Sequence, residues 1–196
     1  SGVSGQALSF EHRNVSVDLR EHVGAFAELD AFTFATWVRD PDHRLAVLFS
    51  LSGESEQHRV QFYVTSRFVR FGWQDGLHFD SISGRVDAWN AGSWHHVAVT
   101  AKDGIVRLYR DGELVACGSM GSKIGTPVST LSTVRDASHA YLGRLEDGRQ
   151  GIESSHQWFK GKMDDAQLYS GAVSQEGIQF MFENPGITWS SGESHE

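Results

Sequence analysis

The chain has 196 residues, 39% of them hydrophobic and 21% charged, with a formal net charge of −8 at pH 7. This composition excludes a disordered or collagen-like chain, and the acidic balance excludes nucleic acid as an expected partner, because phosphate binding needs a basic surface. A single cysteine, Cys117, rules out an internal disulfide, and no apolar run approaches the roughly 20 residues of a membrane span.

Short alternating or apolar runs, separated by turn signals, fill most of the chain. Regular short strands at this spacing predict an all-β sandwich or barrel, and a single two-sheet domain is the simplest organisation. We place this domain at residues 1–186 and a tail or linker at residues 187–196. The predicted strands are QALSFEH, AFTFATWVR, RLAVLFSLS, RVQFYVTS, RFVRFGWQ, WHHVAVTA, GIVRLYRDG, ELVACGS, HAYLGR and GKMDDAQLY.

Residues 59–65 show the period of two that is typical of a strand with two different faces. The even-numbered positions are apolar and predict a core face, whereas Arg59, Gln61 and Tyr63 share a semi-polar, accessible face. The run at 68–73 alternates in the same way, so we expect a tight turn to join the two runs into a hairpin.

Two Asp-Gly pairs, at 103–104 and 111–112, stand between β-rich runs. Glycine accepts the positive φ that tight hairpin turns require. The pairs therefore predict three successive antiparallel strands, at roughly residues 94–101, 104–110 and 113–119.

In the last third of the chain, the regular succession of strand-like runs is interrupted. Residues 119–138 are rich in Gly, Ser and Thr without clear periodicity, which predicts an irregular surface connection. Further on, Ser174 can cap a short helix that ends at Phe182, with Ile178 and Met181 spaced to pack on the sandwich.

Several phrases, in order, resemble the laminin G-like branch of the concanavalin A-like lectin and glucanase superfamily, over nearly the whole chain. They are GQALSF, FTFATWVR, SWHHVAVT, VRLYRDGELV, AYLGR and FKGKMDDAQLYSGAVS. The resemblance implies an antiparallel two-sheet jelly roll with a short C-terminal helix, which binds ligands on a concave face or at rim loops. Such domains often bind glycans or proteins, and many carry calcium. The stretch LFSLSGESEQHRVQFYVTS, followed by RFVRFGWQDGLHFDS, is similar to lectin modules of bacterial sialidases and fructan-degrading enzymes.

Calcium is the one cofactor that the resemblance suggests, and Asp164 matches the acidic position of the family pattern. Calcium prefers several hard oxygen ligands, so Asp164 and Asp165 alone do not make a site. The family usually has an Asp-Gly after its first strand, where this chain has Phe10-Glu11-His12. The alternative is that Asp164 caps backbone donors at a tight strand start.

The semi-polar face of the predicted hairpin is the leading ligand-binding candidate. Sugars are bound by flat apolar surfaces together with fixed polar groups, and a guanidinium can grip a carboxylate through two hydrogen bonds. The alternatives are a solvated sheet face with cross-strand pairs and, for the rim loop after AYLGR, an ordinary charged turn. The candidate residues are Arg59, Gln61, Tyr63, Arg70, Trp73, Asp75, His78 and Arg144.

Other conspicuous residues have simpler expected roles. The resemblance puts Trp37 and Trp94 at core positions that fill the sandwich. Trp89 and Trp158 lie near predicted loops and are further binding candidates, although Trp158 can also simply pack. We expect Cys117, in a strand-like run, to be a small buried filler. His95 is expected to be a structural core histidine.

The sequence carries no G-x-S-x-G, no H-E-x-x-H, no phosphate loop and no E-x-D-x-x-E triplet of the superfamily's glucanases. We therefore expect a non-catalytic, lectin-like carbohydrate-binding module of a larger extracellular protein or enzyme, secreted or at the cell surface. Its expected partner is a glycan or polysaccharide. One alternative is a protein-binding adhesion domain, and a second is a polysaccharide-degrading enzyme of the same fold.

Overall fold

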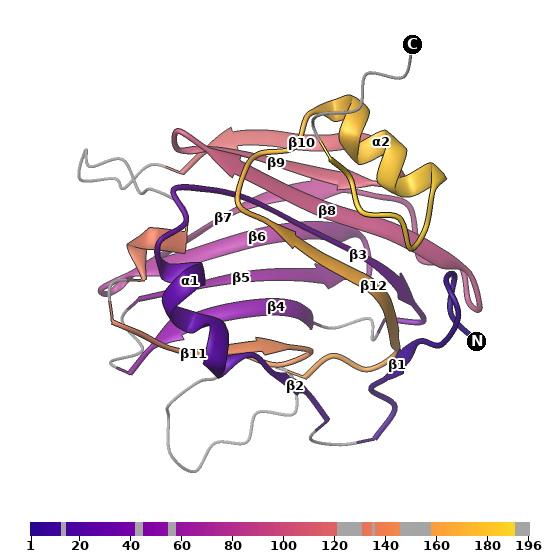
Figure 1. The fold of residues 1–196 in the computed structure, drawn as a ribbon, viewed down its shortest axis with the longest axis horizontal. Helices are drawn as coiled ribbons and strands as arrows, with labels where there is room; N and C mark the ends of the chain where they lie inside the picture. Colours follow the sequence, from indigo (N-terminus) through magenta and orange to yellow (C-terminus); the bar gives the residue numbers. More distant parts are fainter. Residues whose placement is uncertain are drawn as a thin grey trace.

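The computed structural model describes residues 1–12, 15–41, 45–54, 58–120, 131–134, 136–145 and 158–190. Figure 1 shows two antiparallel sheets packed face to face, which confirms the predicted sandwich of the jelly-roll class. Sheet A has the order β1 (Leu8–Ser9), β12 (Lys162–Tyr169), β3 (Ala31–Arg39), β8 (Trp94–Lys102), β9 (Ile105–Arg110) and β10 (Glu113–Ser119). Sheet B has the order β2 (Val17–Asp18), β11 (Ala137–Leu142), β4 (Ala46–Gly53), β5 (His58–Thr65), β6 (Phe68–Asp75) and β7 (His78–Arg85).

The main core lies between the inner faces of the two sheets. Phe34 of sheet A stacks on Phe49 at a centroid distance of 5.2 Å and meets Phe62 edge-on at 5.9 Å, both in sheet B. Each ring occupies an inward position of its strand, and burial of one such side chain stabilises the fold by about 2–3 kcal/mol. The alternating apolar pattern thus accounts for how the sheets pair.

The predicted turns and hairpins are confirmed. In the β8–β9 turn, Asp103 and Gly104 have φ of 51° and 73°, and in the β9–β10 turn Asp111 and Gly112 have φ of 50° and 81°. Asp and Gly are among the few residues that accept this left-handed region readily. Strand β5 pairs with β6 in continuous register, as the alternation predicts.

Helix α2 (Gln175–Glu183) covers part of the outer face of sheet A (Figure 1). The hydroxyl of Ser174 accepts a hydrogen bond from the Gly177 amide at 3.3 Å, so the predicted cap is confirmed. Ile178 and Met181 are buried against Ala35 of β3 and its neighbours. The remaining helices are short: η1 (Arg20–His22), α1 (Val23–Ala27) and η2 (Leu131–Thr133). Among the described residues, no helix has the length and apolar character needed to cross a membrane.

The start of the predicted tail contacts the domain. The ring of Trp189 lies 5.3 Å from that of Phe180 in α2, and its backbone N–H donates to the hydroxyl of Tyr169 at 2.9 Å. Residues 191–196 lie outside the described part of the chain.

Three packing predictions were wrong. Trp37 is buried, but it points to the outer side of sheet A and stacks on Phe182 of α2 at 5.6 Å instead of filling the space between the sheets. The reason is that successive side chains of a strand point to opposite faces of the sheet. Phe34 and Val38 face the main core, so Trp37 faces the helix. Cys117 is exposed because β10 is the edge strand of sheet A. Trp94 is only partly buried, at the start of β8. Trp89, predicted as a binding candidate, is instead buried in the main core, where its ring N–H donates to the Thr65 backbone oxygen at 2.7 Å.

The free edges of the two sheets approach each other closely. A Cβ on Gly84 of β7 would lie 2.6 Å from a methyl carbon of Val115 in β10, and one on Gly118 would meet Ile82 at 3.1 Å. Only glycine at position 84 permits this contact without displacing Val115. Strands β7 and β10 therefore close one side of the sandwich.

Candidate functional site

The outer face of sheet B gathers the predicted hairpin residues. Strands β11, β4, β5, β6 and β7 pair side by side, so side chains that are register partners form rows across the sheet. Arg59, Gln61, Tyr63 and Arg70 lie on this face together, as predicted. The rows are His139, Ser52, Arg59, Gln74 and Phe79; Tyr141, Ser50, Gln61, Gly72 and Ser81; and Val47, Tyr63, Arg70 and Ser83.

The centre of the face is a buried polar floor. Gln61 is only 4% exposed, and Ser50 and Ser52 beside it are buried as well. The Ser50 hydroxyl donates to the backbone oxygen of Arg144 at 2.6 Å. Within the described part of the chain, neither the side-chain oxygen of Gln61 nor the hydroxyl of Ser52 has a hydrogen-bond partner. An unsatisfied buried polar atom costs about 1–3 kcal/mol, so this floor is suited to a polar ligand or ordered water.

Three arginines surround the floor, and each guanidinium lies over an aromatic ring. Stacking holds a guanidinium by its flat face, whereas its hydrogen-bond donors lie in the plane. This combination provides planar donors that can grip a carboxylate in a fixed geometry. The pairs are Arg59 over Phe79 at 5.9 Å, Arg70 over Phe68 at 4.7 Å, and Arg144 over Tyr141 at 4.7 Å and over Trp158 at 5.0 Å.

The nearby carboxylate of Asp18 has its own cation. A hydrogen bond from the Arg20 side chain at 2.7 Å, joined by one from its backbone N–H, holds the pKa of the Asp18 carboxyl below its ordinary value, and the charge of Arg144 adds to the effect. Arg20 is therefore the main cation of Asp18, and Arg144 is the one arginine of the polar floor whose charge acts on this carboxylate.

Two of the predicted residues, Gln61 and Tyr63, prove less accessible than the sequence suggested. Tyr63 is 3% exposed and packs with Val47 and Leu145 in a small apolar cluster on the outer face. The physical reason for Tyr63 is that Leu145 and Val47 pack against its ring. Arg59 and Arg70 remain partly exposed at its rim.

Trp73 does not belong to the site. It is 4% exposed and lies in the main core, because its register partner Val60 faces inward. Asp75 and His78 face each other at the far end of the β6–β7 hairpin, where Asp75 also lies 3.4 Å from His58. They are therefore separated from the centre of the floor.

Sequence reasoning missed Ser50, Ser52, Phe79 and Tyr141. The same period of two was present in RLAVLFSLS and AYLGR, where polar or amphipathic residues alternate with apolar ones. What the sequence lacked was the order of the strands, because β11 reaches β4 across a long separation along the chain.

Asp164 lies far from this face, at the start of β12. One carboxylate oxygen accepts the Ser4 amide at 3.0 Å, and the other accepts the Asp165 amide at 2.9 Å. No group of three or more His, Cys, Asp or Glu gathers anywhere in the described part of the chain. Both carboxylate oxygens of Asp164 thus accept backbone donors, which is the arrangement that the capping alternative predicts.

We expect Asp164→Ala to lower the free energy of unfolding by about 2 kcal/mol, because two backbone donors lose a charged acceptor. We also expect EDTA followed by excess calcium to leave the melting temperature of the unaltered protein unchanged. Thermal unfolding measures both. A calcium-dependent rise that Asp164→Ala abolishes would instead establish a metal site.

Comparisons with known proteins agree with this architecture. A family model described as "Concanavalin A-like lectin/glucanases superfamily", of the laminin G type, matches residues 14–179. Among solved structures, the CBM40 module of Ruminococcus gnavus IT-sialidase, bound to α2,3-sialyllactose, is similar with a TM-score of 0.74 at 15% identity, covering 90% of this chain and 96% of that one.

Two further similarities come from animals. Mouse laminin α1 chain domains LG4-5 match with a TM-score of 0.63 at 12% identity, over 89% of this chain and 44% of that one. The adhesion G-protein coupled receptor V1 of Danio rerio is 29% identical over 96 residues, which are 49% of this chain and 1% of the receptor. The structural likenesses show the fold, and the matched segment is a small part of the receptor.

Proposed function

The chain belongs to the concanavalin A-like lectin/glucanase superfamily, and we propose that it is a carbohydrate-binding module that takes an acidic sugar on the outer face of sheet B. The observation that carries this proposal is the polar floor ringed by arginines that lie over aromatic rings. Sugars combine apolar ring faces with many hydroxyls, which such a surface matches.

The arginines favour an acidic sugar over a neutral one. A carboxylate accepts two parallel N–H bonds from one guanidinium, and such charge-assisted bonds are about twice as strong as neutral ones. Arg70 is the best placed, because it lies next to Tyr63 in register and its Nε has no hydrogen-bond partner in the described part of the chain. The likeness to a module bound to α2,3-sialyllactose supports this ligand class.

Calorimetric titration with α2,3-sialyllactose, and with lactose as the neutral counterpart, tests the proposal. We expect the sialylated sugar to bind and lactose to bind at least about tenfold more weakly. Arg70→Lys keeps the charge but loses the planar donors, so we expect it to weaken binding by about tenfold or more. Arg107→Ala, on the exposed side of β9 in sheet A, is the matched control and should bind as the unaltered protein does. Equal affinity for both sugars would contradict the acidic-sugar assignment.

We also propose that the module is non-catalytic and serves a larger extracellular protein, in which residues 1–186 form the domain. Two observations support this: no pair of carboxylates lies on the polar floor among the described residues, and laminin and adhesion-receptor domains are similar to this chain. Glycoside hydrolysis ordinarily needs two carboxyl groups across the bond that breaks.

A second candidate function is protein adhesion, which one feature favours. Leu77, at the tip of the β6–β7 hairpin, is 92% exposed, and Phe79 beside it is also exposed. Neighbouring exposed apolar side chains on a hairpin are typical of protein contacts. Under this hypothesis Leu77→Asp would abolish capture of a protein partner, whereas α2,3-sialyllactose would not compete for it.

A further inference from the structure

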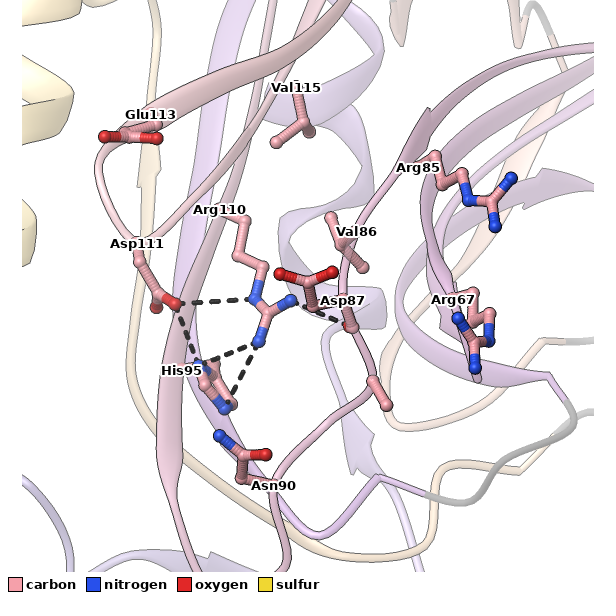
Figure 2. Close-up of a pocket in the computed structure, with 11 residues that line it drawn as sticks. Arg67, Arg85, Val86, Asp87, Asn90, His95, Arg110, Asp111, Glu113 and Val115 are labelled. Atoms are coloured by element: carbon pink, nitrogen blue, oxygen red, sulfur yellow. Dashed lines mark hydrogen bonds and ion pairs between the residues drawn. The ribbon is translucent and has the colours of Figure 1, made fainter.

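A polar cavity opens at one end of the sandwich, and none of its lining residues belongs to the polar floor; Figure 2 shows these residues. Its volume is about 900 Å³, within the range of sites that hold small ligands. We call it the end pocket. Its walls come from the β5–β6 turn, the segment after β7, the start of β8 and the β9–β10 hairpin. The lining residues are Arg67, Arg85, Val86, Asp87, Ala88, Asn90, His95, Arg110, Asp111, Glu113 and Val115.

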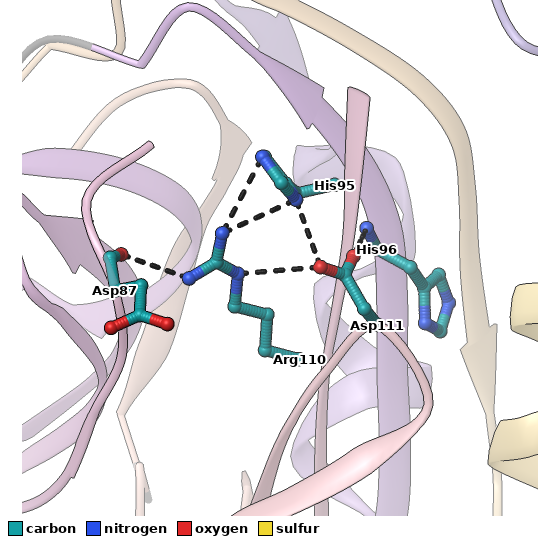
Figure 3. Close-up of polar contacts among 5 residues, drawn as sticks. All are labelled: Asp87, His95, His96, Arg110 and Asp111. Atoms are coloured by element: carbon teal, nitrogen blue, oxygen red, sulfur yellow. Dashed lines mark hydrogen bonds and ion pairs between the residues drawn. The ribbon is translucent and has the colours of Figure 1, made fainter. Parts of the chain in front are cut away.

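One wall of the end pocket is a fixed polar network (Figure 3). His95 is joined to the Asp111 carboxylate through Nδ1 at 2.8 Å, and Arg110 lies 3.4 Å from the same carboxylate. Arg110 also donates to the backbone oxygen of Asp87 at 2.8 Å and lies over the ring of Trp89 at 4.7 Å. These contacts hold the wall in one geometry and leave the Arg110 charge matched by Asp111.

The other wall carries two arginine side chains that form no ion pair within the described part of the chain. Figure 2 shows Arg67 and Arg85 on one side of Val86, with Arg110 and His95 on the other. Arg67 and Arg85 are both exposed, and in the described part of the chain neither guanidinium has an ion pair or hydrogen bond. Asp87 and Glu113 also line the pocket, so the local attraction for an anion lies on the side that carries Arg67 and Arg85.

We propose that the end pocket binds an acidic saccharide, whose carboxylate or sulfate lies on Arg67 and Arg85 while its hydroxyls reach Asn90 and Asp87. A saccharide fits better than a peptide, because only Val86, Ala88 and Val115 offer apolar surface and the other lining residues are polar or charged. The acidic side chains Asp87 and Glu113 accept hydrogen bonds from hydroxyls. This site lies beyond the proposed function, since it uses none of the residues of the polar floor.

The register shows how the two sites relate. Arg85 pairs with Phe68, the ring that lies under Arg70 at the rim of the polar floor. Diagonal neighbours in a sheet are about 7–8 Å apart, so Arg85 lies close to Arg70, while Arg67 in the β5–β6 turn lines the same pocket as Arg85. Together these arginines mark a basic line from the floor to the end pocket. An extended acidic polysaccharide can follow this line from one site to the other.

The test uses a heparin tetrasaccharide, which carries carboxylates and sulfates, and cellotetraose as its neutral counterpart. Both are titrated in about 150 mM salt, which screens nonspecific attraction beyond roughly 8 Å. The readout is the two-dimensional NMR spectrum of labelled protein. We expect the heparin tetrasaccharide, and not cellotetraose, to shift the side-chain amide of Asn90 and the backbone amide of Asp87.

In the double variant Arg67→Ala/Arg85→Ala, the affinity for the heparin tetrasaccharide, taken from these shifts, should be at least about tenfold lower. In Arg107→Ala it should be unchanged. The double variant should still show α2,3-sialyllactose shifts at Gln61, so failure of this site and failure of the proposed function are distinguishable. The proposal is overturned if Asn90 does not respond, if cellotetraose acts equally, or if the folded double variant binds with unchanged affinity.

Discussion

Replacing Asp111 by alanine is expected to lower the free energy of unfolding by about 3–4 kcal/mol, one of the largest effects available at a position outside the core. Asp111 accepts the backbone N–H of His96 at 2.9 Å and is joined to the His95 ring at 2.8 Å. Burial alone would raise the pKa of the Asp111 carboxyl, yet the hydrogen bond with His95 and the neighbouring charges hold it below its ordinary value of 3.8. The carboxylate is thus charged and committed in the native state.

Three losses add up in this variant. The His96 amide loses its acceptor, the Arg110 guanidinium loses its counter-ion, and alanine must adopt the left-handed φ of 50° that aspartate tolerates better. Urea unfolding of the two proteins measures the difference. Asp111→Asn keeps an acceptor and the tolerance of positive φ, so it should cost about half as much. A cost below 1 kcal/mol for the alanine variant would show that the turn does not depend on this side chain.

The unaltered protein is expected to lose about 2–3 kcal/mol of stability through one histidine as the pH falls from 7 to 4.5. His96 is 2% exposed between the rings of Trp37 and Phe182. Burial lowers the pKa of its imidazole from 6.5 to about 4, although the charges of Asp111 and Asp165 oppose the shift.

The direction of this pH effect follows from how many protons the folded and unfolded chains bind. Between pH 6.5 and 4, His96 takes up a proton in the unfolded chain but not in the folded one, so stability decreases as the pH falls through this window. His96→Phe removes the titrating group from a position where the ring nitrogen Nδ1 has no partner in the described part of the chain. We expect that variant to lose about 2–3 kcal/mol less than the unaltered protein over the same range.

The matched control for this pH experiment is His22→Gln, which removes an exposed histidine. Urea unfolding at pH 7 and 4.5 should give the same pH-dependent loss for this variant as for the unaltered protein. An identical loss in His96→Phe would show that other groups carry the acid sensitivity.

Much of the fold follows from local signals in the chain. The Asp-Gly pairs at 103–104 and 111–112 and the cap at Ser174 each have a local physical cause, so hairpins and helix were predictable without tertiary information. Trp37 was not, because the sequence does not say which strand face is covered by α2. The outer face of sheet A becomes a second buried cluster because helix α2 covers it.

The candidate site was predictable where the alternation of side chains along a strand is enough to decide which face of the sheet a residue occupies. Arg59, Gln61 and Arg70 share a face because β5 and β6 form one uninterrupted hairpin. Tyr141 and the end pocket were not predictable, since they depend on β4 pairing with β11 and on turns of both sheets meeting at one end. Such contacts join residues far apart in sequence, which strand periodicity does not encode.

The most direct test of the account is the NMR signal of the Gln61 side-chain amide during titration with α2,3-sialyllactose. Gln61 lies at the centre of the polar floor, and its side-chain oxygen has no partner in the described part of the chain. We predict a saturable shift of this signal with the sialylated sugar, little shift with lactose, and loss of the response in Arg70→Lys. Saturable binding with no change at Gln61 or its neighbours would place the sugar elsewhere and contradict the account.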